Sequence, residues 1–204
     1  MKTFTPRTFN IPELKGISKK SIDIHINLYE GYVKHANLIN EKIDEMSKDP
    51  VSAEVNSYAI NEMQRRFSFE FDGMKNHEYF FEQLENVGHL SSLTLIDSPF
   101  RVAIEEEWGT FDTWMKRFTA LSLTRGIGWA ILSYDKANSR FVHSWVDEQH
   151  IGQLSNVEVI LALDMWEHSY FLDYAPAEKS KYVEAFFENL NWVKIEERFT
   201  KVKN

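Results

Sequence analysis

Ile127-Gly128-Trp129-Ala130-Ile131-Leu132-Ser133-Tyr134 is the stretch at which the pattern of this sequence changes. The run is short and mostly apolar, a polar turn over 135–139 follows it, and a second run covers 140–146. This pattern predicts a β-hairpin. A third apolar run over 157–163 predicts another strand, which ends at Asp164. We therefore expect a small three-stranded antiparallel sheet in the C-terminal half.

Upstream of this sheet, the apolar residues recur at helical spacing. They predict a long helix over 19–47, which Asp49-Pro50 ends, and a second helix that Ser52 could cap and that runs to about Asn86. Two long helices joined by a short turn form a hairpin. A connector is expected over 88–99, and the remaining predicted helices cover 100–107, 111–124 and 179–201.

These elements predict an α+β protein. A long N-terminal α-helical hairpin would form one domain at 1–88, and an α/β domain with the three-stranded antiparallel sheet would follow at 98–204. The chain has 204 residues, of which 43% are hydrophobic and 14% aromatic, so it can fill a sizeable core.

Composition excludes several classes of function. Because the chain has no cysteine, it has no disulfide, thiolate zinc site, iron–sulfur cluster or cysteine nucleophile, and any metal must bind to His, Asp or Glu. The net charge of −8, without a cluster of Lys and Arg, argues against nucleic-acid binding. No apolar run long enough for a membrane span and no secretory signal are found, so we expect a cytoplasmic protein.

Three histidines and one aspartate are the candidate metal ligands. Asp164 follows a mostly apolar strand, so it needs a cation or strong donors to stay ionised, and His168 lies four positions further on. His25 lies inside the first long helix, and His77 lies among aromatic residues. Taken alone, each is also typical of a capping aspartate or a hydrogen-bonded core histidine.

Several motifs resemble those of the iron/manganese superoxide dismutases, in the same order and over nearly the whole chain. The segment Asp164-Met165-Trp166-Glu167-His168-Ser169-Tyr170 is similar to the family signature Asp-x-Trp-Glu-His-Ala-Tyr. The segment Asn76-His77-Glu78-Tyr79-Phe80-Phe81 is similar to its Asn-His-x-x-Phe-Trp motif, with Phe81 in place of the tryptophan. Further agreement lies at 109–112, 123–130 and 191–192.

This resemblance implies a single redox-active metal ion bound by His25, His77, Asp164 and His168. The implied activity converts two superoxide anions into dioxygen and hydrogen peroxide. Trp129 and Trp166 would surround the ligands. Glu167 would reach the last histidine ligand of a partner subunit, so a homodimer is expected, with a tetramer as a further possibility.

The resemblance also bears on the identity of the metal. Manganese members usually present a glutamine from the C-terminal half, whereas many iron members present it from four residues before the second ligand. The latter position is Gly73 here, and Gln149 matches the former, with His150 beside it as a competing candidate. We therefore expect manganese, with iron as the alternative.

The chain departs from the family pattern after the first ligand. The second histidine of the family, four positions after that ligand, is Tyr29, and the gateway tyrosine is expected to be Tyr32, seven positions on instead of eight. We expect a regular α-helix where relatives carry a π-bulge. The tyrosine that would pair with the second histidine across the dimer is Phe171, so Tyr29 is expected to make a different contact.

Two other readings stay open. The changes at Tyr29, Phe81 and Phe171 would also suit a catalytically silent, metal-binding or structural protein of the same fold. A non-haem iron oxygenase uses two histidines and one carboxylate with open coordination positions, and the third histidine argues against it.

Overall fold

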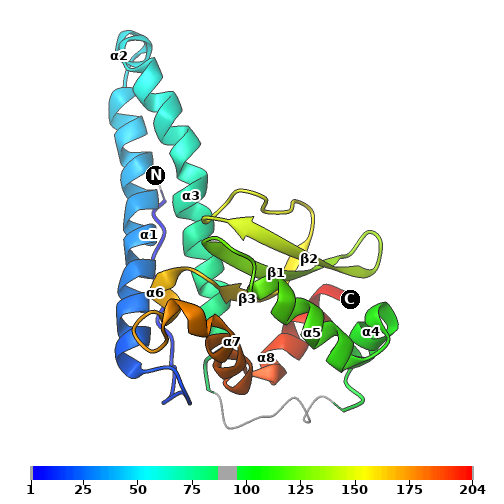
Figure 1. Cartoon of the computed structure of the whole chain (residues 1–204). Coiled ribbons are helices and arrows are strands. Elements are labelled where there is room, and N and C mark those ends of the chain that lie inside the picture. The colour runs from blue at the N-terminus through cyan, green and yellow to red at the C-terminus, as the bar shows by residue number, and fades with distance from the viewer. Residues whose placement is uncertain (1, 87–95, 204) are drawn as a thin grey trace.

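The computed structural model describes residues 2–86 and 96–203 and has the predicted α+β architecture (Figure 1). Two long antiparallel helices, α1 (Lys19–Met46) and α3 (Ser57–Glu82), form the hairpin, with the short α2 (Pro50–Val55) at its tip. The C-terminal half contains α4 (Pro99–Trp108), α5 (Phe111–Ser122), β1 (Gly128–Asp135), β2 (Arg140–Asp147), β3 (Glu158–Asp164), α6 (Glu167–Tyr170), α7 (Lys179–Glu188) and α8 (Trp192–Lys203). No helix of the described ranges is both long and apolar enough to cross a membrane.

The sheet is antiparallel with strand order β2-β1-β3, as the apolar runs predict. The central strand β1 is buried up to Tyr134, which explains its continuous apolar pattern. Its turn to β2 is closed by the Asp135 side chain, which accepts hydrogen bonds from the N–H groups of Ala137 and Asn138 at 3.0 and 3.2 Å. The β1–β3 register pairs Trp129 with Asp164, so the sheet itself places an indole beside the candidate carboxylate ligand.

The prediction of one helix from Ser52 to about Asn86 is wrong. The structure has two helices there, α2 and α3, separated at Asn56, and α3 ends at Glu82. The Asp49 side chain accepts the Ser52 N–H at 2.9 Å, so the cap is Asp49 and Pro50 opens the helix. The Asn56 amide then donates to the Ser52 carbonyl at 2.9 Å, which satisfies a free carbonyl at the end of α2.

The helical patterns predicted over 179–201 correspond to two helices, α7 and α8. Asparagine side chains explain the break between them. The Asn189 amide donates to the Ala185 carbonyl at 2.7 Å near the end of α7, and the Asn191 side chain accepts the Lys194 N–H at 3.2 Å at the start of α8. Most of the predicted connector over 88–99 lies outside the described residues.

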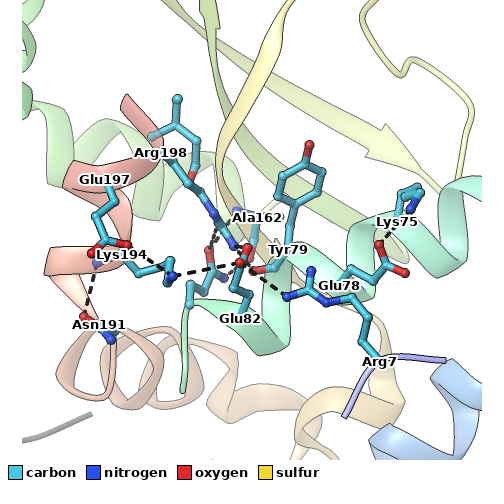
Figure 2. A network of polar contacts seen from close by, with 12 residues as sticks. Arg7, Lys75, Glu78, Tyr79, Glu82, Ala162, Asn191, Lys194, Glu197 and Arg198 are labelled. Atoms are coloured by element: carbon cyan, nitrogen blue, oxygen red, sulfur yellow. Dashed lines mark hydrogen bonds and ion pairs between the residues drawn. The ribbon is translucent and has the colours of Figure 1, made fainter. Parts of the chain in front are cut away.

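A network of polar contacts joins the hairpin to the sheet and to α8 (Figure 2). The guanidinium of Arg198 on α8 donates to the Tyr79 carbonyl at 2.9 Å, to the Ile160 carbonyl at 3.1 Å and to a Glu82 carboxylate oxygen at 2.8 Å. The buried Gln83 side chain bonds both the N–H and the carbonyl of Ala162 in β3. The C-terminal end of α3 is therefore held against β3, which brings the ligand candidates of the two halves together.

Candidate metal centre

The four candidate ligands meet between the hairpin and the sheet. His25 comes from α1, His77 from α3, Asp164 from the last position of β3, and His168 from α6. Their ligand atoms all lie within 4.8 Å of one another. The first three side chains are buried and His168 is partly exposed, so the cluster lies largely inside the protein.

The Asp164 carboxylate is the common neighbour of the three imidazoles. Its Oδ2 atom lies 3.1 Å from the Nε2 atoms of His25 and His168 and 3.6 Å from that of His77. Its Oδ1 atom accepts the Trp166 backbone N–H at 2.7 Å, which fixes the orientation of the carboxylate. All three imidazoles therefore present the same ring nitrogen to one place.

The protonation of His77 follows from its other nitrogen. Nδ1 lies 2.6 Å from the Gly73 carbonyl oxygen, and because a carbonyl can only accept, Nδ1 carries the proton of the neutral ring. The Nε2 atom then has a free lone pair, and it is buried without a hydrogen-bond partner. Buried polar atoms are rarely left without a partner, and a metal ion at this point would satisfy it.

The electrostatics of the site favour the charge states that bind metals. Burial lowers the pKa of His77 to about 3 and also lowers the pKa of His25. Burial alone would raise the pKa of Asp164, but the neighbouring imidazoles of His168 and His25 hold that pKa well below its ordinary value. Neutral imidazoles and an ionised carboxylate are the forms in which these side chains bind a transition metal, so the donor set fits one such ion.

A chain of hydrogen bonds lies beside the ligands. The Trp129 indole N–H donates to Oε1 of Gln149 at 2.8 Å, and Nε2 of Gln149 donates to the Tyr32 hydroxyl at 2.9 Å. Gln149 is fully buried. The structure thus brings together three residues that the sequence predicted to act near the metal. His150, the competing candidate, instead places its ring 5.7 Å from that of Phe69.

Gly73 has a spatial role in this chain. A Cβ atom at this position would lie 2.6 Å from a ring carbon of Tyr32. The tyrosine ring therefore occupies the space next to α3 where a side chain from residue 73 would lie. The centroid of the same ring is 5.0 Å from that of His77, which sets the Tyr32 hydroxyl close to the ligand sphere.

Tyr29 contacts residues of its own chain. Its hydroxyl accepts the Arg7 backbone N–H at 2.8 Å and lies 3.3 Å from a Glu78 carboxylate oxygen, to which it donates. Burial raises the pKa of Tyr29 to about 12. The residue is fully buried and faces the N-terminal segment of its own chain. Helix α1 is α-helical from Lys19 to Met46, which agrees with the predicted absence of a π-bulge.

The remaining predicted residues lie next to His168, the partly exposed ligand candidate. The Trp166 ring stacks on His168 at 5.7 Å between centroids, and its N–H donates to the Glu148 carbonyl at 3.0 Å. Glu167 is exposed, and Phe171 is 57% exposed, which leaves a large apolar side chain at the surface.

Two contributions to the site were missed by the sequence analysis. The Gly73 carbonyl sets the His77 proton, and the spacing of four residues inside a helix was the available signal for it. Asn76 donates from its amide to the Gln149 carbonyl at 3.0 Å and thereby holds the loop that carries this glutamine. Its place directly before a ligand was noticed as a motif, but no role was assigned to it.

Comparisons with known proteins agree with this geometry. A family model described as iron/manganese superoxide dismutases, C-terminal domain, matches residues 97–198. The chain is 35% identical to an iron superoxide dismutase of Cupriavidus metallidurans, over 92% of this chain and 90% of the relative. It is 31% identical to an iron superoxide dismutase of Aquifex aeolicus, over 92% and 86%. A manganese superoxide dismutase of Haloarcula marismortui is 37% identical over 61% of this chain and 59% of the relative.

Proposed function

Because this chain belongs to the iron/manganese superoxide dismutases, it is a superoxide dismutase, and we propose that it works with one manganese ion bound by His25, His77, Asp164 and His168. The overall reaction takes two superoxide anions and two protons to dioxygen and hydrogen peroxide. The observation that carries the ligand assignment is the convergence of three Nε2 atoms on one Asp164 oxygen, with the Nε2 atom of His77 left without a protein partner.

The residues around the site would manage the protons of this reaction. The bound ion would supply the one-electron change that links the two superoxide anions. Burial and the charge of Asp164 hold the pKa of Tyr32 above its ordinary value, so its hydroxyl keeps its proton at neutral pH. Because that hydroxyl already accepts a hydrogen bond from Gln149, its own proton is directed elsewhere and is available for donation to the reduced substrate.

Manganese is the finer part of the proposal, with iron as the alternative. The Gln149 amide comes from the C-terminal half and is held by Trp129 and Tyr32, while residue 73 has no side chain to offer. This arrangement supports manganese by the family pattern. The relatives from Cupriavidus metallidurans and Aquifex aeolicus are both named iron superoxide dismutases, which supports the alternative.

A homodimer, with a tetramer as a further possibility, a cytoplasmic location and a division into domains at 1–88 and 98–204 also remain proposals. The exposed Glu167 and Phe171, next to the partly exposed His168, support a partner subunit over this face. Sedimentation velocity over a range of concentrations tests the dimer, which a monomer at every concentration would exclude.

The observation behind the alternative, a catalytically silent protein, is that Tyr29 and Phe171 replace the cross-subunit pair of the family. The rate of superoxide decay separates the two functions, because a silent protein would not accelerate the decay more than free metal does. The oxygenase reading is disfavoured by the geometry, since His25, His77 and His168 all direct Nε2 to the same carboxylate oxygen.

The test is metal analysis together with activity. Protein produced with both metals available is analysed by mass spectrometry, and separately reconstituted manganese and iron forms are assayed for superoxide decay. We expect both bound manganese and activity of the manganese form. Activity of the iron form alone would refute the manganese assignment, and no activity of either form above free metal would refute the dismutase function.

A pair of variants tests the ligand set. His77→Gln removes a proposed ligand and is expected to lower the metal content severalfold. His143→Gln changes a histidine on β2 outside the site and is expected to leave the metal content unchanged. An equal metal content in both variants would contradict the assignment.

A further inference from the structure

One face of α3 leads from the exposed surface to the metal site. From Arg66 to Phe69 or Glu70, then to Gly73 and His77, each step along this helix is three or four residues, so these side chains share a face. At one end is the proposed ligand His77, and Gly73 lies beneath the Tyr32 ring. At the other end is Arg66, whose side chain is 50% exposed. Gly73 and His77 lie at the metal site itself, and the other three residues lie further out along the helix.

Of the outer three residues, Arg66 contacts both Phe69 and Glu70, and Phe69 lies beside Tyr32. The guanidinium carbon of Arg66 lies 3.7 Å from the centroid of the Phe69 ring, and that ring lies 6.0 Å from the Tyr32 ring. The Nε atom of Arg66 is 3.0 Å from a carboxylate oxygen of Glu70, a side chain that is only 10% exposed. The charges of Glu70 and Arg66 both act on the Tyr32 hydroxyl, with opposite signs.

We propose that Arg66 is the cation that draws superoxide to the mouth of the metal site, which we place at the partly exposed Tyr32, and that Glu70 sets the strength of this attraction. The inference rests on the proposed function. A protein with a net charge of −8 repels an anionic substrate at long range, so a local positive charge at the entrance matters for the rate of encounter. The contacts of Phe69 with Arg66 and with Tyr32 put the guanidinium within about 10 Å of the Tyr32 ring. This distance is close to the screening length of about 8 Å at physiological ionic strength.

The neighbouring Arg65 shows what an ordinary surface pair on the same helix looks like. It bonds Glu62, and both side chains are more than half exposed. Solvent screens the charges of such exposed ion pairs, and the pairs contribute little to stability. Arg66 differs because it lies over the Phe69 ring, which packs beside Tyr32, and because its acidic partner is nine-tenths buried, so its position is fixed relative to the site.

The experiment compares Arg66→Gln, Glu70→Gln and the control Arg65→Gln, all metal-loaded. At low ionic strength we expect Arg66→Gln to lower kcat/KM for superoxide by about two- to fivefold, and Glu70→Gln to raise it by about twofold, because each removes one unit charge near the mouth. Arg65→Gln is expected to match the wild type. The difference between Arg66→Gln and the wild type should vanish at high salt, where screening is strong.

Azide, a small anion, provides a readout that does not depend on turnover. Its dissociation constant, measured by optical titration of the metal-loaded protein, should rise by about the same factor in Arg66→Gln and fall in Glu70→Gln. Opposite effects of the two variants cannot come from a shared loss of packing. Equal kcat/KM and equal azide affinity in Arg66→Gln and Arg65→Gln would overturn the proposal. Absence of dismutation in the wild type would overturn the proposed function instead, and the azide titration would still decide on Arg66.

Discussion

The same substitution at two helical glycines should have opposite effects on stability. In α1, a Cβ atom added at Gly31 meets no atom within 4 Å, so Gly31→Ala should stabilise the protein by about 0.5–1 kcal/mol through the lower entropy of the unfolded chain. In α3, a Cβ atom at Gly73 meets three carbons of the Tyr32 ring at 2.6, 2.8 and 3.0 Å. The ring would have to move away from α3.

The cost at Gly73 has two parts. Overpacking a filled site costs about 1–3 kcal/mol. Moving the Tyr32 ring also breaks or weakens its 2.9 Å hydrogen bond with Gln149, which adds about 1 kcal/mol. After subtraction of the gain in helix propensity, Gly73→Ala should destabilise the protein by about 1–3 kcal/mol.

Urea unfolding of the metal-free protein measures both effects without a contribution from metal affinity. The two variants should differ by about 2–4 kcal/mol, or several degrees in Tm. Activity of the metal-loaded Gly73→Ala protein should fall as well, because Tyr32 is displaced. If Gly73→Ala were as stable as Gly31→Ala, the Tyr32 ring would not depend on the missing side chain, and the spatial role given to Gly73 would be wrong.

Two further predictions concern stability. Arg198→Met should cost about 3–5 kcal/mol in urea unfolding, because it removes the nearest cation from Glu82 and takes a donor from the Tyr79 and Ile160 carbonyls. Lys194→Met, which removes only a 4.0 Å contact to the same glutamate, should cost less than about 1 kcal/mol. Similar losses in the two variants would argue against the Arg198 junction. Burial and the charge of Arg117 lower the pKa of His143 to about 4, so the unfolded chain takes up its proton first as the pH falls and stability is lost between about pH 6.5 and pH 4. His143→Gln should remove up to about 2 kcal/mol of this loss, measured as the difference in unfolding free energy between pH 7 and pH 4.5, and an unchanged difference would exclude the effect.

Much of the site could be predicted because its ligands lie in short local motifs. Asp164 and His168 are four residues apart at the end of an apolar strand, and the structure places both at one centre. The helical hairpin and the three strands follow from periodicity, which depends on neighbouring residues alone. These are features that a linear sequence records directly.

The errors arose where a side chain competes with the regular backbone. The apolar pattern continues across Asn56, yet its amide bonds a carbonyl of the preceding turn and helps to end the helix. Periodicity cannot report such local hydrogen bonds. The orientation of Tyr29 was equally invisible, because it depends on the N-terminal segment that passes over the hairpin and offers the Arg7 N–H.

The ligands are spread from His25 to His168, across both halves of the chain. During synthesis the hairpin can form before residue 168 has been added to the chain. A nascent hairpin would offer an incoming ion only two imidazoles, too few for tight capture. The complete ligand set exists only once the C-terminal half has closed onto the hairpin, so capture of the ion is coupled to the folding of that half.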